Sequence, residues 1–165
     1  MLSENTSFPF ANRILIGPAG AGKSTRARQW GRRLGLPVLD LDRQVERRTG
    51  QPLPQLFAQN PQHFRLHERA ALRGLARHPQ PYILATGGGA PLSRRNRAYL
   101  KQLGKVYFLQ STPQKLVRRL RPVQHTRPRY AGRPLRQVVR QDWRERLRYY
   151  RALANRTLPD SAGQD

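Results

Sequence analysis

The chain has 165 residues, 37% of them hydrophobic, no cysteine, and a net charge of +23 from 32 Lys and Arg against 9 Asp and Glu. Its length allows one domain with a buried core, and the lack of cysteine excludes disulfides and thiolate metal sites. No apolar run approaches the ~18 residues of a membrane span and residues 1–12 lack signal-peptide character, so we expect one cytoplasmic domain over residues 1–165.

Short aliphatic runs alternate along the chain with longer segments whose apolar residues recur every three or four positions. We expect strands at residues 13–17, 37–40, 82–85, 105–109 and 156–158. We expect helices at residues 22–35, 42–49, 61–78, 93–103, 112–121 and 136–154. Such alternation is typical of βαβ units, so the sequence predicts an α/β fold, a three-layer sandwich around a five-stranded parallel sheet.

Residues 50–60 and 121–135 interrupt this pattern. Pro122, Pro128 and Pro134 disfavour regular structure in the second segment. Long irregular loops in a compact domain are commonly lids or binding loops. We therefore expect a lid at 121–135, and we expect both segments to lie near residues 17–24.

Residues 17–24 read Gly-Pro-Ala-Gly-Ala-Gly-Lys-Ser and match the phosphate-loop pattern G-x-x-x-x-G-K-[ST] in full. An expected strand leads into this segment, and an expected helix begins at Gly22. Glycines let backbone N–H groups face the phosphates, Lys23 reaches the β- and γ-phosphates, and the Ser24 hydroxyl ligates Mg²⁺. The predicted nucleotide ligands are Gly17, Ala19, Gly20, Ala21, Gly22, Lys23, Ser24 and Thr25.

Asp40 and Asp42 stand at the end of the second expected strand, the edge at which open α/β sheets bind ligands. Their spacing in an extended segment directs both carboxylates to one side. One carboxylate can support Mg²⁺ while the other orients or deprotonates an attacking hydroxyl. Asp42 has a second interpretation of equal weight, as the N-cap of the helix that follows.

Gly87, Gly88 and Gly89 follow the third expected strand directly. Consecutive glycines allow backbone N–H groups to approach a ligand closely, and they also suit a simple turn from strand to helix.

In this order, the motifs resemble those of shikimate kinase, a nucleoside-monophosphate-kinase-like family of P-loop proteins. The resemblance extends over nearly the whole chain. It rests on residues 17–24, Leu39-Asp40-Leu41-Asp42, Glu46-Arg47-Arg48-Thr49-Gly50, Phe64-Arg65 with Glu68, Gly87-Gly88-Gly89, Arg127-Pro128, and Glu145-Arg146 before Tyr150.

The resemblance implies ATP-dependent phosphorylation of the 3-hydroxyl of shikimate, a step toward the aromatic amino acids, with Mg²⁺ accompanying the ATP. It implies that Asp42 contacts the acceptor hydroxyl as the base and that Asp40 supports Mg²⁺ through water, together with Ser24. The catalytic set would be Asp42, Lys23 and Arg127 of the lid, which reaches the ATP phosphates.

For the acceptor, the resemblance implies a binding segment at 42–78 and carboxylate contacts from Arg65 and Arg146. Arginine suits this role because it forms bidentate, charge-assisted pairs with carboxylates. Gly87, Gly88 and Gly89 would lie against the acceptor ring. Phe57 and Phe64 would wall the ring, although core packing is an equally good interpretation of both.

The sequence departs from the family pattern at two places. Arg129 and Tyr130 follow Arg127-Pro128, where the family usually has leucines, so we expect different lid packing. Beyond Leu158 the family continues with an adenine-contacting loop and a helix that this sequence does not match, so no adenine contact is assigned.

The positive charge leaves two interpretations open. A basic field attracts anions, and nucleic acid is an alternative partner, whereas the spread of arginines from Arg13 to Arg156 also fits an arginine-biased composition. Thirteen arginines fall between residues 118 and 156, more than ATP and one carboxylate require, and another anion is a further possibility. We expect a monomer that binds ATP and shikimate or a similar small hydroxy acid, with no membrane partner.

Overall fold

The structure is a computed structural model that describes residues 12–160. Its centre is a parallel sheet of five strands in the order β2-β3-β1-β4-β5. The strands are β1 (Arg13–Ile16), β2 (Val38–Asp40), β3 (Ile83–Ala85), β4 (Lys105–Gln110) and β5 (Arg156–Pro159). Every predicted strand is confirmed to within two residues, as is the α/β fold class.

Seven α-helices surround the sheet in the described part of the chain. They are α2 (Lys23–Leu34), α3 (Leu41–Thr49), α4 (Leu53–Gln59), α5 (Pro61–Leu75), α6 (Arg94–Leu103), α7 (Pro113–Leu120) and α8 (Leu135–Leu153). Two 3₁₀ segments, η1 (Ala90–Leu92) and η2 (Arg121–Thr126), complete the elements. Among residues 12–160, no helix is both long and apolar enough to cross a membrane.

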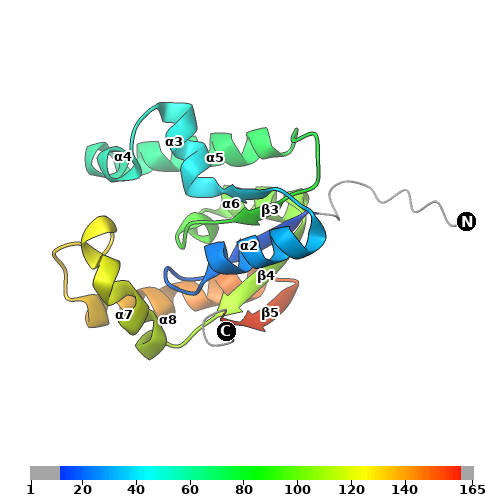
Figure 1. The fold of residues 1–165 in the computed structure, drawn as a ribbon. Helices are drawn as coiled ribbons and strands as arrows, with labels where there is room; N and C mark the ends of the chain where they lie inside the picture. The colour runs from blue at the N-terminus through cyan, green and yellow to red at the C-terminus, as the bar shows by residue number, and fades with distance from the viewer. Residues whose placement is uncertain (1–11, 161–165) are drawn as a thin grey trace, which may run out of the picture.

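Alternate residues of each strand face opposite layers, as the period of a β-strand requires. In β1, Ile14 and Ile16 pack toward α5 and α6, whereas Leu15 packs toward α2 and α7. Helix α8 serves both cores, because Val138 near its start joins the second and Tyr150 near its end joins the first. The result is a sandwich whose sheet is covered on both faces (Figure 1).

Residues 50–60 are not irregular as predicted, because α4 occupies Leu53–Gln59. Pro52 is the N-cap residue and Pro54 lies in the first turn, where a proline removes no helical hydrogen bond. Glu46 of α3 accepts a hydrogen bond from the Leu53 N–H at 2.9 Å, and Leu56 is buried. The prolines therefore begin this helix rather than prevent it.

The N-cap of α3 is Asp40 rather than Asp42. One Asp40 carboxylate oxygen accepts hydrogen bonds from the N–H groups of Asp42 and Arg43, at 3.0 and 3.3 Å. Strand β2 ends at Asp40, and Asp42 lies in the first helical turn. The expectation that both carboxylates leave one extended segment is therefore wrong. Because Asp40 caps the helix, the Asp42 carboxylate is not needed for capping and can contact a ligand.

The predicted lid, residues 121–135, is mostly a sequence of turns, but it begins with η2. Gln124 fixes its shape by donating from Nε2 to the carbonyl oxygens of Tyr130 and Arg133, at 2.8 and 2.7 Å. The segment connects α7 to α8 and lies across from α3 and α4 (Figure 1).

Candidate active site

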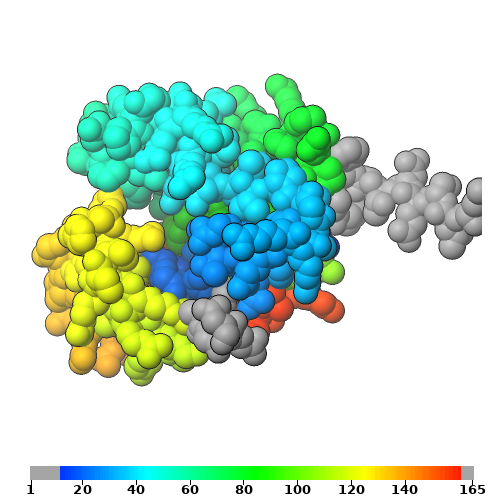
Figure 2. Space-filling view, viewed as in Figure 1, coloured from blue at the N-terminus to red at the C-terminus, as the bar shows by residue number. Residues whose placement is uncertain are grey.

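A cavity of about 500 Å³, here called the central cavity, lies between the α3–α5 layer and the lid. Figure 2 shows the hollow between the cyan atoms of α3 and α4 and the yellow atoms of the lid. The predicted site residues that line it are Ala19, Asp42, Phe57, Phe64, Arg65, Gly87, Gly88, Gly89, Arg127 and Arg146. Residues 50–60 and 121–135, which interrupt the sequence pattern, thus both line one cavity beside the phosphate loop.

The phosphate loop runs between β1 and α2 as predicted. Lys23 is the first residue of α2, is 8% exposed, and donates from Nζ to the carbonyl oxygens of Gly17 and Pro18, each at 2.8 Å. Burial lowers the Lys23 pKa to about 8, and the Asp42 charge opposes that shift. Arg127 of the lid also lowers the Lys23 pKa, because its positive charge lies close by.

Asp42 carries the most chemically distinctive carboxylate of the central cavity. Burial raises its pKa to about 6, and the negative charges of Asp40 and Glu68 act in the same direction. Lys23 and Arg127 oppose the rise. A carboxylate that gains a proton near neutral pH is matched to general base catalysis.

Ser24 and Asp40 line a separate, smaller cavity of about 320 Å³, and Asp42 does not belong to it. Ser24 is exposed at the start of α2, and Asp40 keeps one carboxylate oxygen outside its capping bonds. Hydroxyl and carboxylate oxygens are the donors that Mg²⁺ prefers, so these residues fit the predicted metal role. Residues 12–160 contain no group of three or more His, Asp or Glu side chains that could hold a metal unaided.

The glycine turn after β3 is required by close approach. A Cβ on Gly87 would stand 2.8 Å from Asp42 Oδ1, and one on Gly88 would stand 3.0 Å from the Ala19 backbone nitrogen. A Cβ on Gly89 would overlap the Arg65 guanidinium. The Gly88 carbonyl oxygen accepts a hydrogen bond from the Tyr150 hydroxyl at 2.6 Å, which fixes the turn against α8.

Arg65 is held on α5 by a buried partner. Its Nη1 lies 2.7 Å from Glu68 Oε2, one helical turn away, and Glu68 is 1% exposed. Burial raises the Glu68 pKa, and Arg65 opposes that rise. Asn96 of α6 donates to the same Glu68 oxygen at 2.7 Å. The guanidinium is therefore oriented by Glu68, which Asn96 holds in place.

Arg146 on α8 is held in the same way by Asp142, whose Oδ1 lies 3.0 Å from Arg146 Nη2. Asp142 also accepts hydrogen bonds from Arg129 Nη2 at 2.7 Å and from the Tyr130 hydroxyl at 3.2 Å. The different lid packing expected from Arg129-Tyr130 is thus a connection to α8. Sequence reasoning missed Asn96 and Asp142, although the four-residue spacing of Asp142 and Arg146 was a usable signal.

Phe57 and Phe64 pack in the core, as one of their two interpretations predicts, and they also line the central cavity. Their ring centroids are 4.5 Å apart, and both rings line the central cavity. Phe64 is also a member of the hydrophobic core, with Phe57 packed against it. These aromatic rings give the central cavity an apolar wall opposite its charged groups.

The phosphate loop lies beside a cavity of small-molecule size, and together with the five-stranded parallel sheet this arrangement defines a P-loop α/β protein with room for a small ligand. The sequence pattern described as shikimate kinase matches residues 19–165. The chain belongs to the shikimate kinase family.

Relatives in this family cover the chain to different extents. A shikimate kinase of Paracidovorax citrulli is 37% identical over 154 residues, which are 92% of this chain and 83% of the relative. Another, of Thioalkalivibrio sulfidiphilus, is 44% identical over 110 residues, and this match spans 57% of the relative's length. The structure of shikimate kinase from Acinetobacter baumannii in complex with shikimate matches with a TM-score of 0.86 at 33% identity, covering 94% of this chain and 86% of that one.

Proposed function

We propose that this protein transfers the γ-phosphoryl group of ATP to the 3-hydroxyl of shikimate, giving shikimate 3-phosphate and ADP. The observation that carries the proposal is the central cavity, in which one carboxylate of raised pKa and two oriented arginines line the same space as Ala19 of the phosphate loop. Family membership and the likeness to a kinase structure with bound shikimate support the same acceptor.

The acceptor carboxylate pairs with Arg65 and Arg146 in this proposal. Both guanidiniums line the central cavity, and each is already oriented by a buried acid, so little side-chain entropy is lost when a carboxylate binds. Gly87, Gly88 and Gly89 leave room for a ring beside Asp42 and Arg65. Phe57 and Phe64 supply the apolar contact.

Asp42 receives the proton of the attacking hydroxyl. Its pKa of about 6 leaves it mostly ionised at neutral pH and basic enough to accept that proton as the new O–P bond forms. Asp42 also orients the hydroxyl toward the γ-phosphorus. In phosphoryl transfer, positioning and electrostatics contribute most of the rate.

The ATP phosphates bind the loop from Gly17 to Thr25, where backbone N–H groups and the start of α2 attract anions. Lys23 exchanges its bonds with the Gly17 and Pro18 carbonyl oxygens for phosphate oxygens. Arg127, on the lid and lining the same cavity, stabilises the charge of the transferring group. Closure of the lid excludes water from the reaction.

Ser24 and, through water, Asp40 would hold the Mg²⁺ that accompanies ATP, and the ion would neutralise phosphate charge. A monomeric state and a cytoplasmic location remain predictions.

A coupled assay of ADP release tests the proposal, with shikimate, gluconate and AMP offered separately as acceptors. We expect release that depends on shikimate and saturates with it. Gluconate carries a carboxylate and hydroxyls without the ring, so it separates recognition of the carboxylate from recognition of the whole acceptor. Turnover with gluconate alone would assign the site to a different hydroxy acid.

A further inference from the structure

Asp142 contacts two separate parts of the molecule, although it is only 3% exposed. On its own helix it forms an ion pair with Arg146 Nη2, and from the lid it accepts hydrogen bonds from Arg129 Nη2 and Nε and from the Tyr130 hydroxyl. Tyr130 is itself buried, and burial raises its pKa to about 12, so its hydroxyl stays protonated and donates. One carboxylate therefore joins the lid to α8.

We propose that Asp142 is a positioning residue that couples docking of the lid to binding of the acceptor carboxylate by Arg146. This inference rests on the proposed function, because it takes Arg146 to be a carboxylate ligand.

The charges of the cluster explain the coupling. Within the buried cluster, Arg129 and Arg146 bring two positive charges to the one negative charge of Asp142, an excess of +1. Glu145 also lines the central cavity and acts on Arg129, but it is exposed, so solvent screens its charge. An acceptor carboxylate on Arg146 balances this excess. Charges at low effective dielectric interact strongly, so the balanced cluster holds Arg129, and with it the lid, more firmly. An acceptor without a carboxylate does not balance the charge, so it does not strengthen docking of the lid.

Hydrogen exchange of the lid, residues 121–135, measures the coupling directly. In the wild-type chain we expect saturating shikimate to slow exchange of the lid amides. In Asp142→Asn, which keeps the shape but loses the charge, we expect shikimate to have no such effect on the lid.

Steady-state kinetics give a second readout that a merely structural role would not move. We expect Asp142→Asn to raise the KM for shikimate about 10- to 100-fold and to change the KM for ATP less than about twofold. Arg129→Gln, a change at a partly exposed lid residue that spares the core, should abolish the same lid protection. In a double-mutant cycle, the two substitutions should be far from additive.

Asp160→Asn is the matched control, because Asp160 also pairs with two basic side chains, Arg119 at 3.0 Å and Lys115 at 3.4 Å, and does not line the central cavity. Shikimate should still protect the lid in this variant. If the wild type turns over shikimate, and shikimate protects the lid equally in the wild type, Asp142→Asn and Arg129→Gln, the coupling is overturned. No shikimate turnover by the wild type would instead overturn the proposed function.

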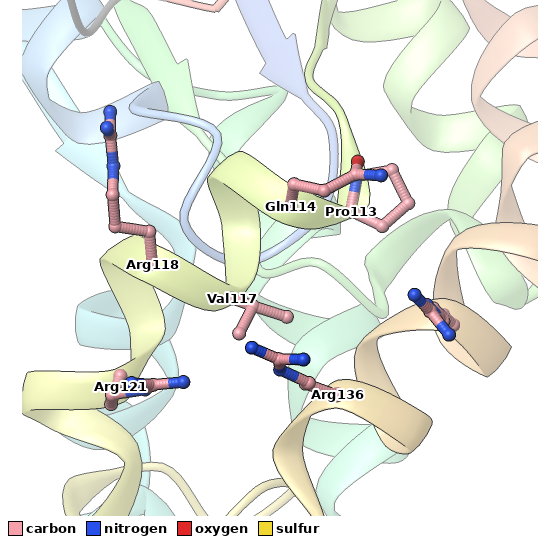
Figure 3. A pocket seen from close by; sticks show the side chains of 7 residues that line it. Pro113, Gln114, Val117, Arg118, Arg121 and Arg136 are labelled. Atoms are coloured by element: carbon pink, nitrogen blue, oxygen red, sulfur yellow. The ribbon is translucent and has the colours of Figure 1, made fainter.

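A second cavity, of about 290 Å³, lies between α7 and the first turns of α8 and is lined by arginines. Arg121 and Arg136 point toward each other beside Val117, whereas Arg118 points away (Figure 3). With Arg140 these are four arginines, no Asp or Glu lines the cavity, and none of the four pairs with a described residue. Arginines three or four residues apart on one helix repel each other.

The geometry points to a binding site for a small anion with two or more charges, of the phosphate class. Helix α8 begins beside this cavity with no side-chain cap and no acidic residue in its first turn, so the partial positive charge of its N-terminus adds to the arginines. Pro113 and Val117 give the cavity an apolar side, and the four arginines are exposed, so an anion can reach them from solvent.

Calorimetric titration with pyrophosphate, in a Lys23→Ala background that weakens phosphate binding by the loop, tests the site. We expect one pyrophosphate per chain, and at least a tenfold loss of affinity in Arg121→Gln/Arg136→Gln. Arg32→Gln/Arg33→Gln removes equal charge from the exposed end of α2 and should retain binding. Equal loss in both double variants would overturn a defined site in favour of a general basic field. A chain that binds a single-stranded oligonucleotide but does not bind pyrophosphate would overturn the small-anion site in favour of a nucleic-acid site.

Discussion

Arg65 and Arg146 line the same cavity, and each is paired with a buried acid of its own helix, yet the two acids have different further partners. Glu68, beside Arg65, is shared with Asn96 of α6, which belongs to the body of the protein. Asp142, beside Arg146, is shared with Arg129 and Tyr130 of the lid. For the proposed acceptor carboxylate, the difference predicts one permanent contact, from Arg65, and one that depends on the position of the lid, from Arg146.

The largest effect is expected where neither arginine is altered. Asp42→Asn removes the proposed base and should lower kcat about 10²- to 10⁴-fold while the KM for shikimate stays within about threefold. Steady-state kinetics with shikimate check this. A variant that retained the full kcat would remove Asp42 from the mechanism and leave the arginines as a binding site only.

The same substitution should make the protein more stable above pH 6. Because the folded-state pKa of Asp42 is raised from 3.8 to about 6, ionisation of Asp42 costs stability as pH rises between these values. Asp42→Asn avoids that cost, of the order of 1 to 3 kcal/mol, and the gain should disappear below about pH 4. Urea unfolding at pH 4 and pH 7.5 measures the difference, and a gain of equal size at both values would contradict the assigned pKa.

Glu68→Gln tests whether Arg65 and Arg146 act independently of each other. It keeps the hydrogen bond from Asn96 but removes the charge that orients Arg65, so the KM for shikimate should rise about tenfold. Shikimate should still slow hydrogen exchange in the lid of this variant, in contrast to Asp142→Asn. Loss of lid protection in Glu68→Gln would mean that the two arginines act as one unit.

A smaller effect is expected at the glycine turn between the arginines. Gly87→Ala places a methyl group 2.8 Å from Asp42 Oδ1 and should lower kcat about 3- to 10-fold by displacing that carboxylate. Gly74→Ala on α5 is the matched control, because its nearest neighbour would be Arg48 Nη1 at 3.7 Å. The control should keep wild-type kinetics and gain about 0.5 to 1 kcal/mol in helix stability. Equal kinetics for both variants would show that Gly87 is a simple turn.

The smallest effects on kinetics are expected from the outer partners of the two acids. Asn96→Ala removes one of the two donors to Glu68, leaving only Arg65, and removes the side-chain donor to the Ala90 carbonyl oxygen, so it should lower the free energy of unfolding by about 1 to 3 kcal/mol. Tyr130→Phe removes one donor to Asp142 at the lid and should cost less than about 1.5 kcal/mol. Urea unfolding checks both variants, and a larger cost for Tyr130→Phe than for Asn96→Ala would contradict the assignment of the permanent contact to the Glu68 side.

The sequence predicted the parts of this site that depend on local pattern. The phosphate loop, the strands and the glycine turn are each encoded within a few consecutive residues, and Arg65 and Arg146 were chosen through the family resemblance. Helix α4 was missed because Pro52 and Pro54 were interpreted by type rather than by position in the first turn. The cap of α3 was misplaced because β2 ends at Asp40, two residues before the expected cap.

The lid connection was beyond local reasoning for a different reason. Arg129 and Asp142 are 13 residues apart across a turn and a helix start, and only the packing of the lid on α8 brings them to 2.7 Å. The buried position of Asp142 likewise follows from the assembled cores. The only sign of this connection in the sequence was that Arg129 and Tyr130 stand where the family usually has leucines.

The pH dependence of shikimate-stimulated ADP release is the most direct measurement of the central claim, that Asp42 acts on an acceptor held in the central cavity. We expect release to require shikimate and kcat/KM to fall about tenfold per pH unit below about pH 6, as Asp42 is protonated. ADP release that is independent of shikimate, or a kcat/KM that stays level from pH 7.5 to pH 4.5, would contradict the account.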